Sequence, residues 1–356
     1  MPSDTNNGTV GTYTKCPVEI LTDEQVNHYK RHIIIPEIGE EGQKRLLNTK
    51  TIVYCENAES LRPLAYYLAA VGTGRIYCCL EDRRGADSLF CEVVDLNNDT
   101  SIGHLSEIYI TADYRIILGN INFFKKTAGK LLREKFVPTI VSINSQWKGT
   151  LKTFDNQEVF NSFIDLINEE DSISDGGSSA FLANALSSTL CAIEGVKLCL
   201  NIGNIQKNML FYDLFNMEFT TTDSNVNLLE KLRDTNSDIK QKLSKAKVLI
   251  VGTGAYGLAI SGIGTLGLLD LDKVEMSNLN RQILHSFSRI GIPKVKSAQF
   301  ILKKIIPKIN IKTHITKLTE DNAGEILSEY DLIIAAVDNI PTRYLINDIC
   351  FSLNKP

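Results

Sequence analysis

Apolar and polar positions follow a regular alternation along this chain, in which short apolar runs are separated by longer amphipathic stretches. The first group of short runs predicts strands at residues 51–55, 75–80, 115–118 and 139–143. Helical spacing appears between them at residues 61–71 and 123–134. Because strands that alternate with helices form parallel sheets with crossover helices, the pattern predicts an α/β fold.

Further segments frame this first group. A helix is predicted at residues 22–29, where Thr22 can cap the helix and Gln25 lies three residues further on. A long apolar helix at 178–200 and a strand at 209–215 close the group. Residues 220–225 are polar, and we place a domain boundary there.

The same alternation then starts again. It predicts strands at residues 247–251, 265–270 and 332–337 and an amphipathic helix at 294–305. The two groups also align with each other: residues 43–60 align on 240–257, residues 72–82 on 262–272, and residues 113–122 on 329–338. An internal repeat of this kind predicts one fold used twice.

The predicted organisation therefore has four parts. Residues 1–20 form a flexible tail, residues 21–222 a first domain, residues 223–240 a linker, and residues 241–356 a second domain. Each domain is long enough to bury its own core.

Composition removes several classes of function. The 356 residues carry a net charge of −4, which argues against a nucleic-acid partner bound through bulk charge. No apolar run reaches the length of a membrane span, and the polar N-terminus has no signal core, so we expect a cytoplasmic protein without a membrane partner. The eight cysteines form no C-x-x-C pair and predict reduced, buried thiols.

A glycine-rich turn follows the predicted strand at 247–251. Gly252, Gly254 and Gly257 would let the backbone approach a phosphate, next to a helix N-terminus that favours negative charge. Asp270 ends the next strand, where it can accept a hydrogen bond from a ribose hydroxyl. This much fits a dinucleotide enzyme equally well.

The residues after Asp270 favour a triphosphate. Arg281 offers a planar fork to phosphate oxygens, and Asn278 and Gln282 offer neutral donors. Lys294 adds a point charge on the next helix, and Asp338 ends a strand where a carboxylate can hold Mg²⁺. Each residue alone could be a solvated surface group, but the ordered set predicts an ATP site.

The motifs GTGAYG, DLDKVEMSNLNRQ, PKV and VDN occur in the order typical of the ThiF/MoeB family of adenylyltransferases. The second domain resembles this family, which includes the ubiquitin-activating enzymes. The resemblance implies that Asp270 holds the ribose and that Asp338 serves the metal. It implies that the triphosphate is held by Asn278, Arg281, Gln282 and Lys294.

The reaction implied by the resemblance is attack of a carboxylate on the α-phosphate of ATP, which yields an acyl-adenylate and pyrophosphate. The expected partner is a small ubiquitin-like or sulfur-carrier protein, or a peptide, that presents its C-terminus. No general base is needed, because a carboxylate is already ionised near neutral pH. The family's later strand pair, final helix and zinc-binding C-x-x-C pairs have no counterpart, so we expect an incomplete second domain and no zinc.

Residues 21–215 also resemble this family, beginning with HYKRHIIIPEIGEEGQKRLL. The nucleotide positions differ, however. Cys55, Asn57 and Ser60 stand at the glycine positions, Leu80 at the ribose aspartate, and Asn122 at the metal aspartate. A leucine cannot bind a ribose hydroxyl, so we expect this first copy not to bind ATP.

Family members pair about a two-fold axis, and an arginine of the opening helix reaches the ATP of the partner domain. Arg31 in HYKRH occupies that position, and the second copy shows no equivalent. The resemblance therefore implies an intramolecular pseudo-dimer in which Arg31 completes the second site. A further homodimer is then possible but not required.

Two other functions stay open from sequence alone. One is an NAD-dependent oxidoreductase that uses the same glycine turn, although no catalytic His or Tyr motif accompanies it. The other is a non-catalytic scaffold. It is supported by the short stretch between Gly257 and Gly262, which has four residues where the first copy has eleven between Ser60 and Gly72. So short a stretch predicts either a remodelled crossover or residues missing from this sequence.

Overall fold

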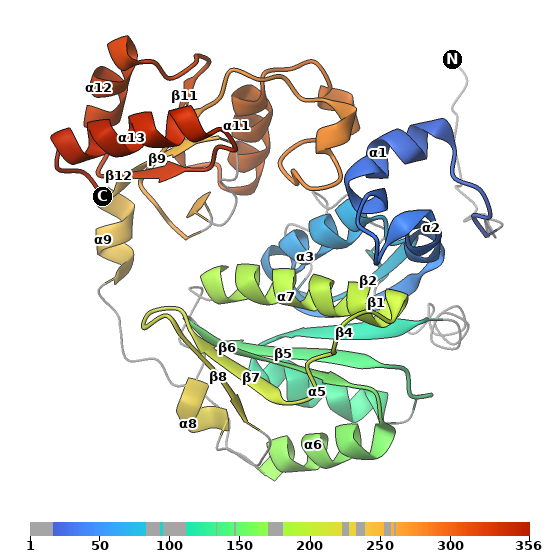
Figure 1. Cartoon of the computed structure of the whole chain (residues 1–356). Helices are drawn as coiled ribbons and strands as arrows, with labels where there is room; N and C mark the ends of the chain where they lie inside the picture. Colours follow the sequence, from blue (N-terminus) through green and yellow to red (C-terminus); the bar gives the residue numbers. More distant parts are fainter. Residues whose placement is uncertain are drawn as a thin grey trace, which may run out of the picture.

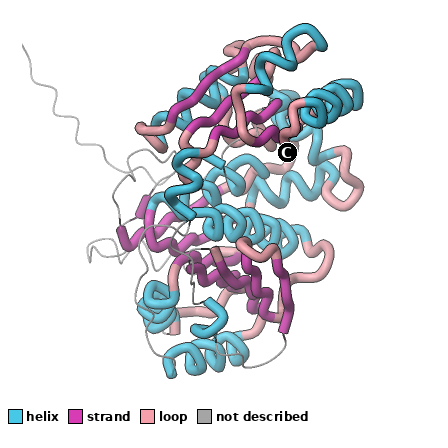
Figure 2. Tube along the Cα trace, turned by 90° about the vertical axis from the view of Figure 1, so that its left-hand side faces the viewer, coloured by secondary structure: helices cyan, strands magenta, loops and turns pink. Residues whose placement is uncertain are grey.

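Two β-sheets, each with helices on both faces, make up the part of the chain that the structure describes (Figure 1). The computed structural model describes residues 17–82, 93–94, 112–132, 134–145, 147–169, 181–222, 228–232, 239–252, 258–259 and 261–356. Figure 2 shows the strands as two separate groups with helices between them. The chain is therefore an α/β protein, as the sequence predicts.

The first sheet is mostly parallel, with an antiparallel side formed by its last strands. Its order is β3-β2-β1-β4-β5-β6-β7-β8. The strands are β1 (Lys50–Asn57), β2 (Arg75–Asp82), β3 (Val93–Val94), β4 (Tyr114–Gly119), β5 (Thr139–Ser145), β6 (Lys148–Phe154), β7 (Met209–Asp213) and β8 (Glu218–Thr222). One face packs on α3 (Ala58–Val71) and α7 (Phe181–Leu200), and the other packs on α5 (Ile121–Leu131), α6 (Gln157–Glu169) and α8 (Leu228–Leu232).

The second sheet is parallel throughout, in the order β11-β10-β9-β12. Its strands are β9 (Lys247–Val251), β10 (Thr265–Leu269), β11 (Asn310–His314) and β12 (Leu332–Ala335). Its helices are α9 (Ile239–Lys245), α11 (Lys294–Ile305), α12 (Glu320–Ser328) and α13 (Ile340–Ser352), with 3₁₀ turns η3 (Met276–Asn278) and η4 (Phe287–Arg289). One buried cluster includes residues of α11, and the other includes residues of α12 and α13.

Most predicted elements are confirmed within a few residues. The capping box at the first helix is present: Thr22 accepts from the backbone of Gln25, whose side chain accepts from the backbone of Thr22. That helix, α1 (Asp23–Ile33), is longer than predicted, and α2 (Gly39–Asn48) follows it.

Strands β3 and β11 and helices α2, α6 and α12 were not predicted, and three further details differ from the prediction. Strand β8 was missed, because its residues are polar and exposed; its threonines are β-branched and pair with β7. The predicted linker at 223–240 contains α8, whose Leu228 and Leu232 are buried in the first core. In the predicted tail, Val18 is tied to α2, since its N–H donates to the side chain of Asn48. Residues 1–16 lie outside the described part.

The two sheets repeat the same local geometry. The order β3-β2-β1-β4 of the first sheet matches β11-β10-β9-β12 of the second, and Lys50 pairs with Arg75 as Lys247 pairs with Thr265. The backbone N–H of Lys50 donates to Asp113 at 2.8 Å, and that of Lys247 donates to Asp331 at 2.8 Å. The two sequence groups therefore share their backbone geometry. The match of Asp113 with Asp331 also shifts the predicted alignment of residues 113–122 on 329–338 by two positions.

The connection between β9 and β10 is much shorter than its counterpart in the first sheet. Helix α3 links β1 to β2, whereas the described part of the β9–β10 connection is helical only at residues 258–259. The strands are nevertheless parallel neighbours. Tyr66 of α3 and Ala185 of α7 pack against the cluster on that face of the second sheet. The first half of the chain therefore helps to cover the second sheet.

The first and second halves also meet through α1. This helix contacts η3 (Met276–Asn278), and Figure 1 shows it beside the orange segment of the second half. Its own anchor lies in the first half, where His32 shares a hydrogen bond with the fully buried Gln43 and Gln43 donates to the carbonyl of Val71. Residues near Arg31 are thus held at the boundary between the halves.

The described cysteines are free thiols. Cys55, Cys78, Cys79, Cys191 and Cys350 are buried, and burial raises the pKa of Cys199 to about 11. Among the helices that the structure describes, none is both long and apolar enough to cross a bilayer.

Candidate nucleotide site

The candidate site lies where β9, β10 and β12 end. Gly252 follows β9 with a positive φ of 123°, and its N–H donates to the carbonyl of Leu269 at 2.7 Å. A Cβ at this position would meet the carbonyl oxygen of Ala336 at 2.7 Å, so only glycine fits between the ends of β9 and β12. Gly254 and Gly257 lie outside the described residues.

Asp270 comes directly after β10, as predicted. Its Oδ1 accepts the backbone N–H of Asp272 at 2.9 Å. Burial raises the pKa of Asp270; the Asp272 N–H and Lys294 oppose this rise, and the carboxylates of Asp272 and Asp338 add to it. The carboxylates of Asp270 and Asp338 therefore lie close enough to repel each other.

Lys294 begins α11 and is only 8% exposed. Its ammonium donates to Asp272 Oδ2 at 2.8 Å, and its backbone N–H donates to the carbonyl of Asp272 at 2.8 Å. The Asp272 side chain is 69% exposed. The lysine is thus held at the site by a solvent-facing carboxylate that an anion could replace.

Arg281 lies between charged groups from both halves of the chain. Partial burial lowers the pKa of its guanidinium, and the charge of Arg31 on α1 lowers it further, whereas Asp338 raises it. The structure therefore brings Arg31, Arg281 and Asp338 into one electrostatic neighbourhood. Two arginines near each other form a strong attraction for an anion such as phosphate.

The uncharged residues between Asp270 and Lys294 differ in how their side chains are hydrogen-bonded. Asn278 is 6% exposed, and its Oδ1 accepts the backbone N–H of Glu275 at 3.0 Å, so it shapes the η3 turn. In the described part of the chain, the buried Oε1 of Gln282 has no hydrogen-bond partner. The same holds for Nδ2 of Asn280, a 2% exposed residue that the sequence reasoning did not select.

His285 is a second residue that sequence reasoning missed. It is 8% exposed, and its Nδ1 shares a hydrogen bond of 3.0 Å with Ser297. Burial, with the charges of Lys294 and Arg289, lowers its pKa from 6.5 to about 4. The imidazole is therefore neutral at pH 7 and adds no cation beside Lys294.

Lowering the pH should destabilise the fold through His285. Between pH 6.5 and about 4 the unfolded residue binds a proton that the folded one does not, so stability falls as pH falls through this window. His285 should contribute roughly 2 kcal/mol to the decrease in the free energy of unfolding between pH 7 and pH 5. Urea denaturation measures the free energy of unfolding at both pH values. Its change between pH 7 and pH 5 should be smaller for His285→Asn than for the wild type. An equal difference in the two proteins would contradict this assignment.

The corresponding region of the first sheet is built differently. Because Asp113 matches Asp331, the residue that corresponds to Asp338 is Asn120, and the predicted counterpart Asn122 is two positions off. The backbone N–H and side-chain Nδ2 of Asn120 both donate to the carboxylate of Glu56, at 3.0 and 2.9 Å. Leu80, at the position of Asp270, is 2% exposed.

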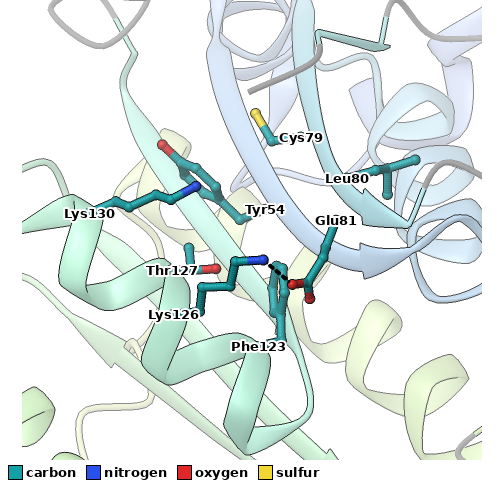
Figure 3. A pocket seen from close by; sticks show the side chains of 8 residues that line it. All are labelled: Tyr54, Cys79, Leu80, Glu81, Phe123, Lys126, Thr127 and Lys130. Atoms are coloured by element: carbon teal, nitrogen blue, oxygen red, sulfur yellow. Dashed lines mark hydrogen bonds and ion pairs between the residues drawn. The ribbon is translucent and has the colours of Figure 1, made fainter. Parts of the chain in front are cut away.

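A small pocket in the first half lies between β1, β2 and α5 (Figure 3). It is lined by Tyr54, Cys79, Leu80, Glu81, Phe123, Lys126, Thr127 and Lys130. Figure 3 shows the Lys126 ammonium paired with the Glu81 carboxylate. None of the predicted nucleotide-binding residues lines it, so the pocket is separate from the site at β9, β10 and β12.

Comparison with known proteins finds a similarity in the second half of the chain. A family model matches residues 226–356. The model is that of the ThiF family. Every described residue of the candidate site except Arg31 lies inside the ThiF match.

Relatives with named activities each match about a third of the chain. The adenylyltransferase and sulfurtransferase MOCS3 of Culex quinquefasciatus is 48% identical over 121 residues, which is 32% of this chain and 28% of that protein. The sulfur carrier protein adenylyltransferase of Thermus thermophilus is 40% identical over 123 residues, 33% of this chain and 45% of that protein. The chain therefore spans less than half the length of these relatives.

A solved structure is also similar over part of the chain. The tRNA N6-threonylcarbamoyladenosine dehydratase TcdA of E. coli, in complex with ATP, is 27% identical and has a TM-score of 0.32. The likeness covers 33% of this chain and 51% of TcdA.

In the described residues, no cluster of three or more His, Cys, Asp or Glu side chains is placed to hold a metal ion. Asp338 is exposed between β12 and α13, which suits the way Mg²⁺ binds through one or two carboxylates plus substrate phosphates.

Proposed function

We propose that this chain is an ATP-dependent adenylyltransferase that activates a carboxylate as an acyl-adenylate and releases pyrophosphate. The observation that carries the proposal is the gathering of Asp270, Arg281, Lys294 and Asp338 at the ends of three parallel strands, inside the ThiF match. The adenylyltransferases that each match about a third of this chain support it.

Each group then has a role that fits its position. Asp270 would accept a ribose hydroxyl, and Gly252 with the following turn would bring backbone N–H groups to the phosphates. Arg281 and Lys294 would bind the triphosphate, helped by donors from Asn278 and Gln282. Because the Asn278 Oδ1 is already used, its Nδ2 is the atom that could donate to a ligand.

The chemical step needs charge stabilisation more than proton transfer. An ionised carboxylate oxygen attacks the α-phosphorus, the bond to the β-phosphate oxygen breaks, and pyrophosphate leaves with the electron pair. The fixed cations Arg281 and Lys294 offset the charge that develops on the phosphate oxygens. Mg²⁺, held by Asp338 and the phosphates, would neutralise part of the same charge.

Lys294 is prepared for this role by its ion pair with Asp272. The pair holds the buried ammonium in place and gives its charge a partner. When the triphosphate binds, its oxygens can take over the ammonium and the exposed Asp272 can turn to water. The lysine therefore needs little reorganisation on binding.

The two halves are proposed to be tandem copies of one domain, of which the first has lost its nucleotide site. The matching strand order and register support this view. In the first copy Glu56 stands at the position of Thr253 in the glycine turn, and its carboxylate would repel a phosphate. Leu80 offers no acceptor for a ribose. The halves then pair as an intramolecular pseudo-dimer with one working site.

The acceptor is proposed to be a small sulfur-carrier or ubiquitin-like protein that presents its C-terminus. The named activity of the Thermus thermophilus relative on a sulfur carrier protein supports this class. A free peptide C-terminus is the alternative acceptor of the same chemistry.

The direct test is exchange of labelled pyrophosphate into ATP, in the presence of Mg²⁺ and a carrier protein that ends in Gly-Gly. Exchange that depends on the carrier supports adenylation. Nicotinamide nucleotide binding without exchange would indicate the oxidoreductase instead. Absence of both activities would indicate a non-catalytic scaffold and contradict the proposal.

Arg31 should contribute to this exchange although it belongs to the first half. Arg31→Ala is expected to slow exchange by about tenfold, because a charge-assisted hydrogen bond to phosphate contributes more binding free energy than a neutral one. Lys30→Ala, which removes another exposed cation of the same helix, is the matched control. Equal exchange rates for Arg31→Ala and the wild type would show that α1 does not serve the site.

A further inference from the structure

Asn280 occupies an unusual place beside the candidate site. It is only 2% exposed, whereas its neighbour Arg281 is exposed. A buried amide in a loop destabilises the fold unless its polar atoms are hydrogen-bonded. Its hydrogen bonds therefore indicate what the side chain does.

Among the described residues, only the oxygen of this amide has a hydrogen-bond partner. Asn280 Oδ1 accepts from Nη1 of Arg281 at 3.1 Å, and the same Nη1 donates to the carbonyl of Ser277. Two neutral acceptors thus hold one corner of the guanidinium. The hydrogen bonds of the described residues leave Nε and Nη2 of Arg281 unused, and these are the donors that can bind a phosphate as a pair.

From this geometry we infer that Asn280 is a positioning residue that orients Arg281 for a polyphosphate. The inference rests on the proposed ATP site and deepens it. An amide suits this task better than a carboxylate, because it fixes the guanidinium without neutralising it. Arg281 also lies near Arg31, and the repulsion between the two would turn an unrestrained side chain away.

The other end of the amide argues against a purely structural role. Nδ2 of Asn280 is buried and has no hydrogen-bond partner among the described residues. An unmade hydrogen bond at a buried donor destabilises the folded state. A leucine of similar size would avoid that loss, so orientation of Arg281, and not stability, accounts for the asparagine.

The test compares stability with nucleotide affinity. Asn280→Leu is expected to keep or raise the melting temperature and to weaken binding of MgATP by about tenfold, as expected for a misplaced charged donor. Asn280→Asp should also weaken binding, because its carboxylate pairs with Arg281, and this loss should shrink at high salt. Asn347→Ala, an exposed asparagine of α13, is the control and should bind as the wild type does.

A double-mutant cycle shows whether Asn280 acts through Arg281. In an Arg281→Ala background, adding Asn280→Leu should cause no further loss of MgATP binding. Losses that simply add, or an unchanged affinity in Asn280→Leu, would overturn the inference. If the wild type itself binds no MgATP, the proposed function fails, and that result is distinct from the other two.

Discussion

Replacing Arg281 with alanine should lower the rate of carrier-dependent pyrophosphate exchange by about 100-fold, since removal of one fixed donor to a developing anion has an effect of this order. The side chain combines a permanent charge with a fixed orientation, because its Nη1 is held by Ser277 and Asn280. Part of the loss should appear as a higher KM for ATP and part as a lower kcat, since the cation faces the phosphates in both the ground state and the transition state.

The matched control for Arg281 is Arg289→Ala. This arginine lies in the same segment but stacks on the ring of Phe300, with its guanidinium carbon 3.7 Å from the ring centre. It should retain most of the activity. Arg281→Lys should recover only part of the rate, because an ammonium cannot donate two parallel hydrogen bonds. Full activity of Arg281→Ala would contradict the assignment of the site.

Replacing Asp338 with asparagine should lower the rate of pyrophosphate exchange by a similar factor, but this loss should depend on the Mg²⁺ concentration. Removing the carboxylate weakens the hold on Mg²⁺, so exchange should fall by about 100-fold and recover in part at high Mg²⁺ concentration. The change is nearly isosteric, and the exposed side chain lies in a loop, so the melting temperature should stay within about 2 °C of the wild type. Titration of exchange activity with Mg²⁺ measures the effect.

Asp348→Asn provides the control for the loss of one negative charge. Asp348 is exposed on α13, in the same part of the chain as Asp338. Its replacement should leave the Mg²⁺ titration unchanged. If Asp338→Asn and Asp348→Asn gave the same titration curve as the wild type, Asp338 would not be the metal-binding residue.

The sequence predicted the framework of this protein well because its elements have strong local signals. The helix at 294–305 and the strand at 247–251 match α11 and β9 at both ends, since each has an unbroken periodicity and clear flanking residues. Asp270 directly follows β10 and Lys294 begins α11, as predicted, whereas β12 ends at Ala335, three positions before Asp338.

The remaining errors have physical causes. Asn122 was matched to Asp338 because the apolar run of β4 allows several ungapped alignments. The strand pairing and the hydrogen bonds of Asp113 and Asp331 fix the register. Asn280 and His285 were missed because their importance depends on burial, which short-range pattern does not reveal. The ion pair in which Lys294 donates to Asp272 joins residues 22 positions apart, and no local sequence pattern predicted it.

The contact between α1 and η3 has a consequence for how the protein is made. Helix α1 is synthesised before the first sheet, whereas η3 follows only after the whole first sheet has been synthesised. The first half can fold around its own core as it emerges, because its strands and helices are complete before residue 239. Arg31 therefore lies on a surface that can fold first, and the proposed nucleotide site would be completed only after η3 has been synthesised and has packed against α1.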